Sequence, residues 1–132
     1  MTTRKTVTAT NSQVAHLDAH NLAIGYLWKQ RWENRVNAMA HCIEALVVNH
    51  EMTEAAAELA TIQAYAELDA ANQVARIDIQ ASTADVVVLR TEGGRPVMFT
   101  TRDLVRVLEQ ARAAGLAKVV DRDTRRPVVL EH

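Results

Sequence analysis

The chain has 132 residues, of which 48% are hydrophobic and 23% are charged, and its formal net charge is −1. This length fits one domain, or a small domain with a helical appendage, and this balance excludes disorder across the body of the chain. No apolar run approaches the roughly 18 residues of a membrane span, the polar N-terminus lacks a secretory signal, and Cys42 is the only cysteine. We therefore expect a cytoplasmic protein without disulfides or membrane segments.

The first predicted element is a helix from about Asn11 to His50. Apolar residues recur along it with a period of about 3.6 residues, which is typical of one buried helix face. Gly25 weakens the helix, so either one long helix or two nearly collinear helices would fit. The residues that we expect in the core on this face are Trp28, Trp32, Val36, Met39 and Ile43.

A second helix is predicted from Thr53 to about Asn72, with Thr53 as its N-cap. The intervening "NHEMTE" (49–54) reverses the chain, so the two helices form an antiparallel hairpin. The second helix is rich in alanine, and the large indoles of the first helix would fill the space that these small side chains leave. On this interpretation the indoles belong to the core, and the nearby cations point away from them into solvent.

The first helix is longer than the second, so residues 12–24 extend beyond the hairpin. Their apolar side chains need cover from the rest of the chain or from another copy of it. A second hairpin placed over both helical faces would give a four-helix-bundle homodimer. The apolar residues that need this cover are Val14, Leu17, Leu22, Ile24 and Leu27.

The pattern changes to strands and one short helix after Val74. "ARIDIQ" (75–80) alternates like a strand, and "DVVVLRTEGGRPVMFT" (85–100) reads as two strands around the Gly-Gly turn at 93–94. Thr100 and Asp103 form a capping-box pattern for a helix that Gly115 would end. "KVVDRDTRRPVV" (118–129) is a further strand pair, so the second half has the order β-ββ-α-ββ.

Together these elements predict an α+β fold, with a long N-terminal helical hairpin followed by a small antiparallel sheet and one packed helix. We expect a flexible N-terminus (1–10), a helical hairpin that mediates dimerisation (11–75) and a small α+β domain (76–129). Residues 130–132, Leu-Glu-His, match the junction of a C-terminal histidine tag and are left out of the functional reasoning.

No pattern in the sequence predicts catalysis, a cofactor or a metal site. His41 and Cys42 are neighbours on a helix and point about 100° apart, so they cannot act together as base and nucleophile. Neither of the two serines lies in a nucleophile-elbow pattern. His16 and His20 share one helix face, but zinc needs about three or four ligands, and nothing downstream completes the set.

The remaining charged feature is a group of arginines in the second half. Residues 44–85 carry one basic and eight acidic groups, a balance of −7, whereas residues 86–130 carry nine basic and five acidic groups, a balance of +4. The arginines are either solvated, or contact an acidic protein, or bind phosphates. They are Arg102, Arg106 and Arg112 on the predicted helix, and Arg122, Arg125 and Arg126 in the final hairpin.

The run "VVVLRTEGGRPVMFTTRDLVRVL" (86–108) resembles the strand–turn–strand–helix half of a cystathionine-β-synthase (CBS) domain. In that family a Thr-x-x-Asp at the helix start often contacts the ribose of an adenosine nucleotide, and Thr100 and Asp103 match this spacing. The resemblance implies an adenosine-nucleotide sensor, while a capping box explains the same pair. Met98 stands where the family usually has glycine, and a second hairpin directly after the helix departs from the pattern.

The sequence therefore favours a non-enzymatic interaction or regulatory protein that acts through protein–protein contacts, as a homodimer with an unidentified protein partner. Its size and Ala/Arg-rich composition are typical of small bacterial or mobile-element accessory proteins. The alternative is a nucleic-acid-binding regulator that uses the basic C-terminal helix and hairpin. The second alternative is the CBS-like nucleotide sensor.

Overall fold

The computed structural model describes residues 8–120 and 127–132, with side chains from Asp18 onward. This part of the chain contains four α-helices, a short 3-10 helix and two small antiparallel sheets, which confirms the predicted α+β class. The described residues form two compact units: residues 8–68 with 119–120 and 127–129, and residues 69–118 with 130–132. The last strand pair is thus divided, since residues 119–120 and 127–129 group with the helices, whereas residues 117–118 and 130 group with the α+β part.

Helix α2 spans Thr8–Lys29, and the chain then turns before α3 begins at Arg35 and runs to His50. The prediction of one continuous or collinear helix to His50 is therefore wrong. Gly25 lies inside α2, and the break falls instead at residues 30–34. Its local cause is Asn34, whose side-chain oxygen accepts a hydrogen bond from the Asn37 N–H at 2.8 Å, because asparagine is among the best N-caps.

Helix α4 spans Glu54–Ala70 and follows a tight reversal of the chain. Glu51 adopts a left-handed backbone conformation with φ of 55°, and the Met52 N–H donates to the Leu46 carbonyl at 3.2 Å. The Thr53 hydroxyl accepts from the Ala56 N–H at 3.2 Å. The predicted reversal and its capping residue are therefore confirmed.

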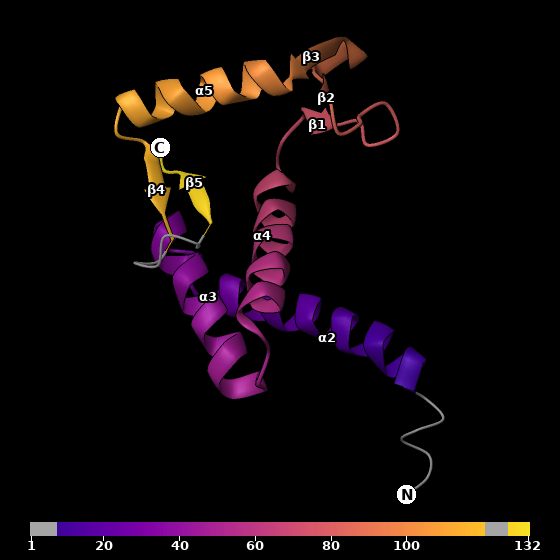
Figure 1. Ribbon diagram of the computed structural model, residues 1–132, viewed down its shortest axis with the longest axis vertical. Helices are drawn as coiled ribbons and strands as arrows, with labels where there is room; N and C mark the ends of the chain where they lie inside the picture. The colour runs from indigo at the N-terminus through magenta and orange to yellow at the C-terminus, as the bar shows by residue number, and fades with distance from the viewer. Residues whose placement is uncertain (1–7, 121–126) are drawn as a thin grey trace, which may run out of the picture. The chain divides into compact units, whose positions relative to one another are not determined.

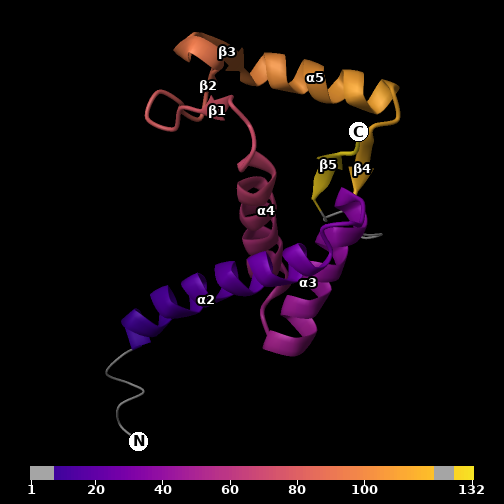
Figure 2. The same cartoon turned by 180° about the vertical axis from the view of Figure 1, so that it is seen from behind.

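The three helices of the first unit enclose its core. Figures 1 and 2 show α2 lying across one side of the pair formed by α3 and α4. Helix α2 contributes residues spaced four apart, which marks a single buried face. The core cluster consists of Ala19, Ala23 and Leu27 from α2, Ala38, Met39, Cys42, Ile43 and Leu46 from α3, Ala57, Ala60 and Ala64 from α4, and Val120.

Small side chains let the helices approach closely at Cys42. The buried Thr61 hydroxyl donates to the Cys42 Sγ atom at 3.2 Å, and Sγ lies 3.8 Å from the Ala23 carbonyl oxygen. One side chain thus contacts all three helices. Burial raises the pKa of the Cys42 thiol above its ordinary value, and the hydrogen bond from Thr61 opposes this shift only in part.

Of the residues predicted to lie in the core, some are buried and others are exposed. Met39 and Ile43 are 2% and 3% exposed, which confirms their burial, and Val36 is half-buried. Trp28 and Trp32 are 57% and 85% exposed, so their assignment to the core is wrong. The physical reason is the turn at 30–34: α2 ends before Trp32, and the buried face of α2 runs through Ala23 and Leu27 instead.

The second unit contains a three-stranded antiparallel sheet of order β1-β2-β3. Strands β1 (Arg76–Ile77), β2 (Val86–Arg90) and β3 (Pro96–Thr100) are aligned so that Leu89 pairs with both Ile77 and Val97. The predicted Gly-Gly hairpin is confirmed. Gly93 and Gly94 have positive φ values of 83° and 78°, which residues with a side chain rarely adopt. Strand β1 is much shorter than its alternating sequence predicts.

Helix α5 (Thr101–Ala113) follows β3 directly and contacts it. Thr100 caps the helix as predicted, and Gly115 with φ of 74° follows its end. The last strands, β4 (Ala117–Val119) and β5 (Val128–Leu130), form a separate two-stranded sheet instead of joining the first. Strand β5 includes Leu130, the first residue of the Leu-Glu-His end that resembles a tag junction.

Candidate interaction sites

The exposed indoles surround an arginine at the junction of α2 and α3. The Arg31 guanidinium lies 4.5 Å from the ring centre of Trp28 and 5.1 Å from that of Trp32. Its Nη1 also donates to the Trp28 carbonyl at 2.8 Å. These cation–π contacts hold the three side chains together, so the prediction that cations and indoles lie apart is wrong. We call Trp28, Arg31 and Trp32 the aromatic corner.

Helix α4 presents a second exposed apolar surface in the same unit. Leu59 and Ile62 are 50% and 41% exposed, and both lie on the side of α4 that faces away from its buried alanines. Tyr65 is half-buried at the edge of this side, three residues after Ile62. We call Leu59, Ile62 and Tyr65 the outer face of α4.

The arginines of α5 are exposed, but they do not form one cluster. Arg102 and Arg106 are four residues apart and share a helix face, and Glu109 lies on that same face three residues later. Arg112 lies six residues beyond Arg106, so it points to a different side of the helix. The other three predicted contact residues, Arg122, Arg125 and Arg126, lie outside the described residues.

Thr100 and Asp103 form a reciprocal capping box at the start of α5. The Thr100 hydroxyl accepts from the Asp103 N–H at 3.2 Å, and an Asp103 carboxylate oxygen accepts from the Thr100 N–H at 2.9 Å. The hydrogen bonds from the Thr100 backbone and hydroxyl lower the pKa of Asp103. The capping explanation of this pair is therefore confirmed, and both side chains take part in it.

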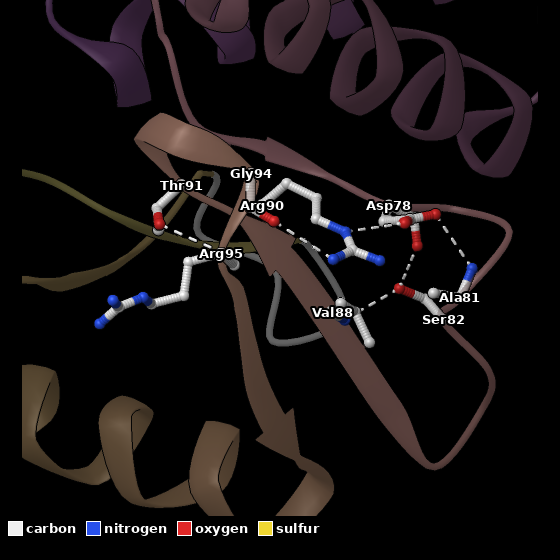
Figure 3. A network of polar contacts seen from close by, with 8 residues as sticks. All are labelled: Asp78, Ala81, Ser82, Val88, Arg90, Thr91, Gly94 and Arg95. Atoms are coloured by element: carbon white, nitrogen blue, oxygen red, sulfur yellow. Dashed lines mark hydrogen bonds and ion pairs between the residues drawn. The ribbon is translucent and has the colours of Figure 1, made fainter.

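A polar network holds the loop between β1 and β2 (Figure 3). The Asp78 carboxylate accepts from the Arg90 Nε at 3.0 Å and from the Ala81 N–H at 3.0 Å. The Ser82 hydroxyl donates to the Asp78 carbonyl at 2.6 Å and accepts from the Val88 N–H at 2.9 Å. The serine and the carboxylate therefore have structural partners, and neither is arranged as a nucleophile with its base.

Replacing Asp78 with asparagine should make stability less sensitive to acid. The hydrogen bond from Ala81, followed by that from Arg90, lowers the pKa of Asp78. Its stabilising contribution is therefore complete above the unfolded-state pKa of about 3.9 and is lost as the pH falls through the lower folded-state value. Thermal unfolding of both proteins from neutral pH to about pH 2 should show their difference in Tm shrinking on acidification. A difference that does not change with pH would contradict this linkage.

Three histidines of the described part, His20, His41 and His50, make contacts between helices. His20 Nε2 lies 2.7 Å from a Glu67 carboxylate oxygen and so joins α2 to α4. The Tyr26 hydroxyl is hydrogen-bonded to His50 Nε2 at 3.0 Å, and the same tyrosine ring meets the His41 ring edge-on with centres 6.3 Å apart. These contacts help to fix α2 against its neighbours.

A metal site does not assemble among the residues whose side chains are described, because no group of three or more possible ligands is found there. The side chain of His16, which the sequence places on one face with His20, lies outside the described set. A shallow hollow of about 240 Å3 lies on α3. Its described lining comes from one helix and has no hydroxyl, thiol or amine nucleophile: His41, Glu44, Ala45, Val48 and Asn49.

Comparisons with known proteins do not extend these observations. No protein-family model, curated protein or solved structure matches this chain. The likeness of residues 86–108 to half of a CBS domain is therefore a local resemblance in the sequence. No helix in the described part is both long and apolar enough to cross a membrane.

Proposed function

We propose that this chain is a non-enzymatic interaction protein that works as a homodimer. In this proposal the helical unit associates with a second copy, and the other unit presents its exposed apolar surface to a different protein. The observation that carries the proposal is the distribution of side-chain size. In the described part of the chain, small apolar residues are buried and many large ones are exposed.

The size distribution is reversed from that of an ordinary domain. Among the residues whose side chains are described, alanine supplies eight of the fourteen buried apolar residues, whereas fourteen large hydrophobic residues are exposed, both tryptophans among them. Burial of a large side chain contributes roughly 1.5–3 kcal/mol, so leaving many of them in water forgoes a substantial part of the available stabilisation. Contiguous exposed apolar surface commonly marks a protein-binding site.

The second unit supports the same proposal. Among its described residues only Ala111 is a buried apolar residue, while Ile77, Ile79 and Met98 are 61%, 83% and 66% exposed. A small sheet with one helix needs an apolar face that is covered in order to be stable. A protein partner that packs against the sheet would supply this cover. Such a role is one of binding and does not involve catalysis.

A nucleic-acid-binding regulator is the alternative proposal, and it would use Arg102 and Arg106 with the final hairpin. The acidic Glu109 on the same face of α5 weakens its attraction for phosphate. The nucleotide-sensor alternative would need Thr100 and Asp103 to bind a ribose while they also cap α5. We therefore favour the interaction protein.

Mass measurement tests the homodimer. Light scattering at micromolar concentration should give twice the 14.6 kDa of one chain, and a mass of one chain would contradict the proposal. The partner surface is tested by comparing proteins captured by the wild type with those captured by Ile79→Asp. Loss of one captured protein in the variant, with an unchanged dimer mass, is the expected result, whereas identical captures would count against the partner surface.

A further inference from the structure

We propose that the homodimer forms by exchange of α2 between two copies of the chain. In this exchange the turn at residues 30–34 opens, α2 and α3 join into one helix, and each α2 docks on α3 and α4 of the other copy. The inference rests on the proposed homodimer and names the element that forms it. In the single chain α2 and α3 remain the separate helices described above.

The surface that receives α2 already fits this helix. A polar contact fixes the position of α2 on α4, since His20 Nε2 lies 2.7 Å from a Glu67 carboxylate oxygen. An α2 helix from a second copy makes the same contacts residue for residue, so the exchange needs no new docking surface. A second copy is therefore the occupant for which the structure supplies every contact. The residues of α2 that belong to the shared core are Ala19, Ala23 and Leu27.

The turn at residues 30–34 leaves backbone groups without partners. The Glu33 N–H donates to the Gln30 carbonyl at 2.9 Å, which is the spacing of a 3-10 turn. Among the described residues, the N–H groups of Trp32 and Asn34 donate to no other group. A continuous α-helix gives each of these N–H groups a carbonyl four residues earlier. Opening of the turn therefore adds hydrogen bonds to the backbone.

The amino acids of the turn are compatible with a helix. Neither proline nor glycine occurs between residues 26 and 50, and Gln30, Arg31 and Glu33 are of types that form helices well. The local stop signal is Asn34, whose side chain caps α3. A single cap separates helices that the rest of this segment would allow to join.

Joining the helices also gives the two tryptophans a place in line with buried residues. Trp28 and Trp32 are 57% and 85% exposed in the single chain, whereas Met39 is 2% exposed. Trp32 and Trp28 precede Met39 by seven and eleven residues, which is about two and three turns of a continuous helix. All three side chains then lie on one face. Because the tryptophans lie at the opened turn, where the two joined helices meet, the dimer removes apolar surface from water.

A covalent link between α2 and α4 tests which chain supplies α2. In the variant His20→Cys with Glu67→Cys, a short bifunctional thiol reagent can join the two positions, whose wild-type side chains are in contact and partly exposed. Cys42 is buried and stays in place. At a concentration where light scattering gives a dimer, the link should join two chains, so that a denaturing gel shows twice the mass of one chain. Either substitution alone should leave the chains unlinked.

Arg35→Pro distinguishes the closed turn from the open one. Position 35 begins α3, where proline is favoured, and Asn34 has the extended backbone (φ −67°, ψ 163°) that a residue before proline adopts. In a joined helix the same proline lies in the interior and breaks it. The variant should stay folded by circular dichroism, and sedimentation should show a dissociation constant raised at least about a hundredfold. Arg35→Ala, which removes the same side chain and its contact with Tyr65, should keep the wild-type value.

Asn34→Ala should act in the opposite direction. The substitution removes the cap that stabilises the separate α3, and alanine is the best helix former inside a joined helix. The dissociation constant should therefore fall at least about threefold. A rise instead would mean that the closed turn is the form present in the dimer, and would overturn the exchange.

The outcomes separate this inference from the proposed function. A dimer whose cross-links all lie within one chain, or whose dissociation constant is the same for Arg35→Pro and Arg35→Ala, would overturn the exchange and leave the homodimer standing. A wild type with the mass of one chain at every concentration would overturn both.

Discussion

Replacing Leu46 with alanine is expected to lower the free energy of unfolding by about 2–5 kcal/mol. Leu46 is 0% exposed and belongs to the core that α2, α3 and α4 share. Alanines make up half of this core cluster, and their short side chains cannot move into the cavity that the substitution leaves. We therefore expect the loss of unfolding free energy to lie in the upper part of this range. Urea unfolding monitored by circular dichroism measures it.

Val48→Ala is the matched control on the same helix. Val48 is 67% exposed, so its truncation removes few contacts, and a change within about 0.5 kcal/mol is expected. Equal losses of stability in the Leu46 and Val48 variants would mean that α3 does not bury the face described here.

Replacing Ala64 with leucine should have the second large effect, in this case through excess volume. Ala64 is 0% exposed on α4, at a position where α4 contributes an alanine to the shared core. Inserting a larger side chain into a well-packed core costs about 1–3 kcal/mol or more, because helices or rotamers must shift. The midpoint of urea unfolding should fall accordingly.

Ala56→Leu tests whether this effect depends on burial. Ala56 lies on α4 but is exposed, and leucine is nearly as good a helix former as alanine. We expect its stability to match that of the wild type. An Ala64 variant that is as stable as the Ala56 variant would show that the helices have room between them, contrary to the close approach at Cys42.

Helix caps and turns were predictable from the sequence, because each depends on a side chain that bonds to the nearby backbone or on a glycine that allows a positive φ. Thr53 caps α4, Thr100 and Asp103 cap α5, and the glycines at 93 and 94 turn the hairpin, as the sequence predicts. Each cap or turn depends on atoms within a few residues of one another, so the tertiary fold does not alter it. Asn34 caps α3 through the same kind of local hydrogen bond. An asparagine at this position is therefore the signal in the sequence for the break between α2 and α3.

The aromatic corner was not predictable from helical periodicity. The spacing of Trp28 and Trp32 places them on one face only if a helix continues through both, and α2 ends at Lys29. Trp28 follows the buried Leu27 and so points about 100° away from the buried face of α2, and Trp32 lies in the turn after α2 has ended. Their contact with Arg31 depends on the conformation of that turn, which no regular period encodes.

The candidate sites, too, were predictable from the sequence only in part. The sequence identified the alanine-rich second helix, whose buried alanines belong to the core, and the unequal distribution of charge. It placed the candidate binding arginines on the last helix and in the final hairpin, and it did not single out Arg31 and Arg35, which contact aromatic rings in the described part. Which arginine meets which ring depends on how the helices cross.

The sequence alone determined the α+β class, the reversal near residue 51, the hairpin at 93–94 and the caps of α4 and α5, because these features follow from short-range hydrogen bonding and backbone preference. Only the tertiary structure decided that α2 and α3 are separate helices, that alanines fill their shared core, and that Trp28 and Trp32 face outward. Burial depends on which surfaces meet, and close helix packing selects small side chains for the interior and leaves the largest ones at the surface.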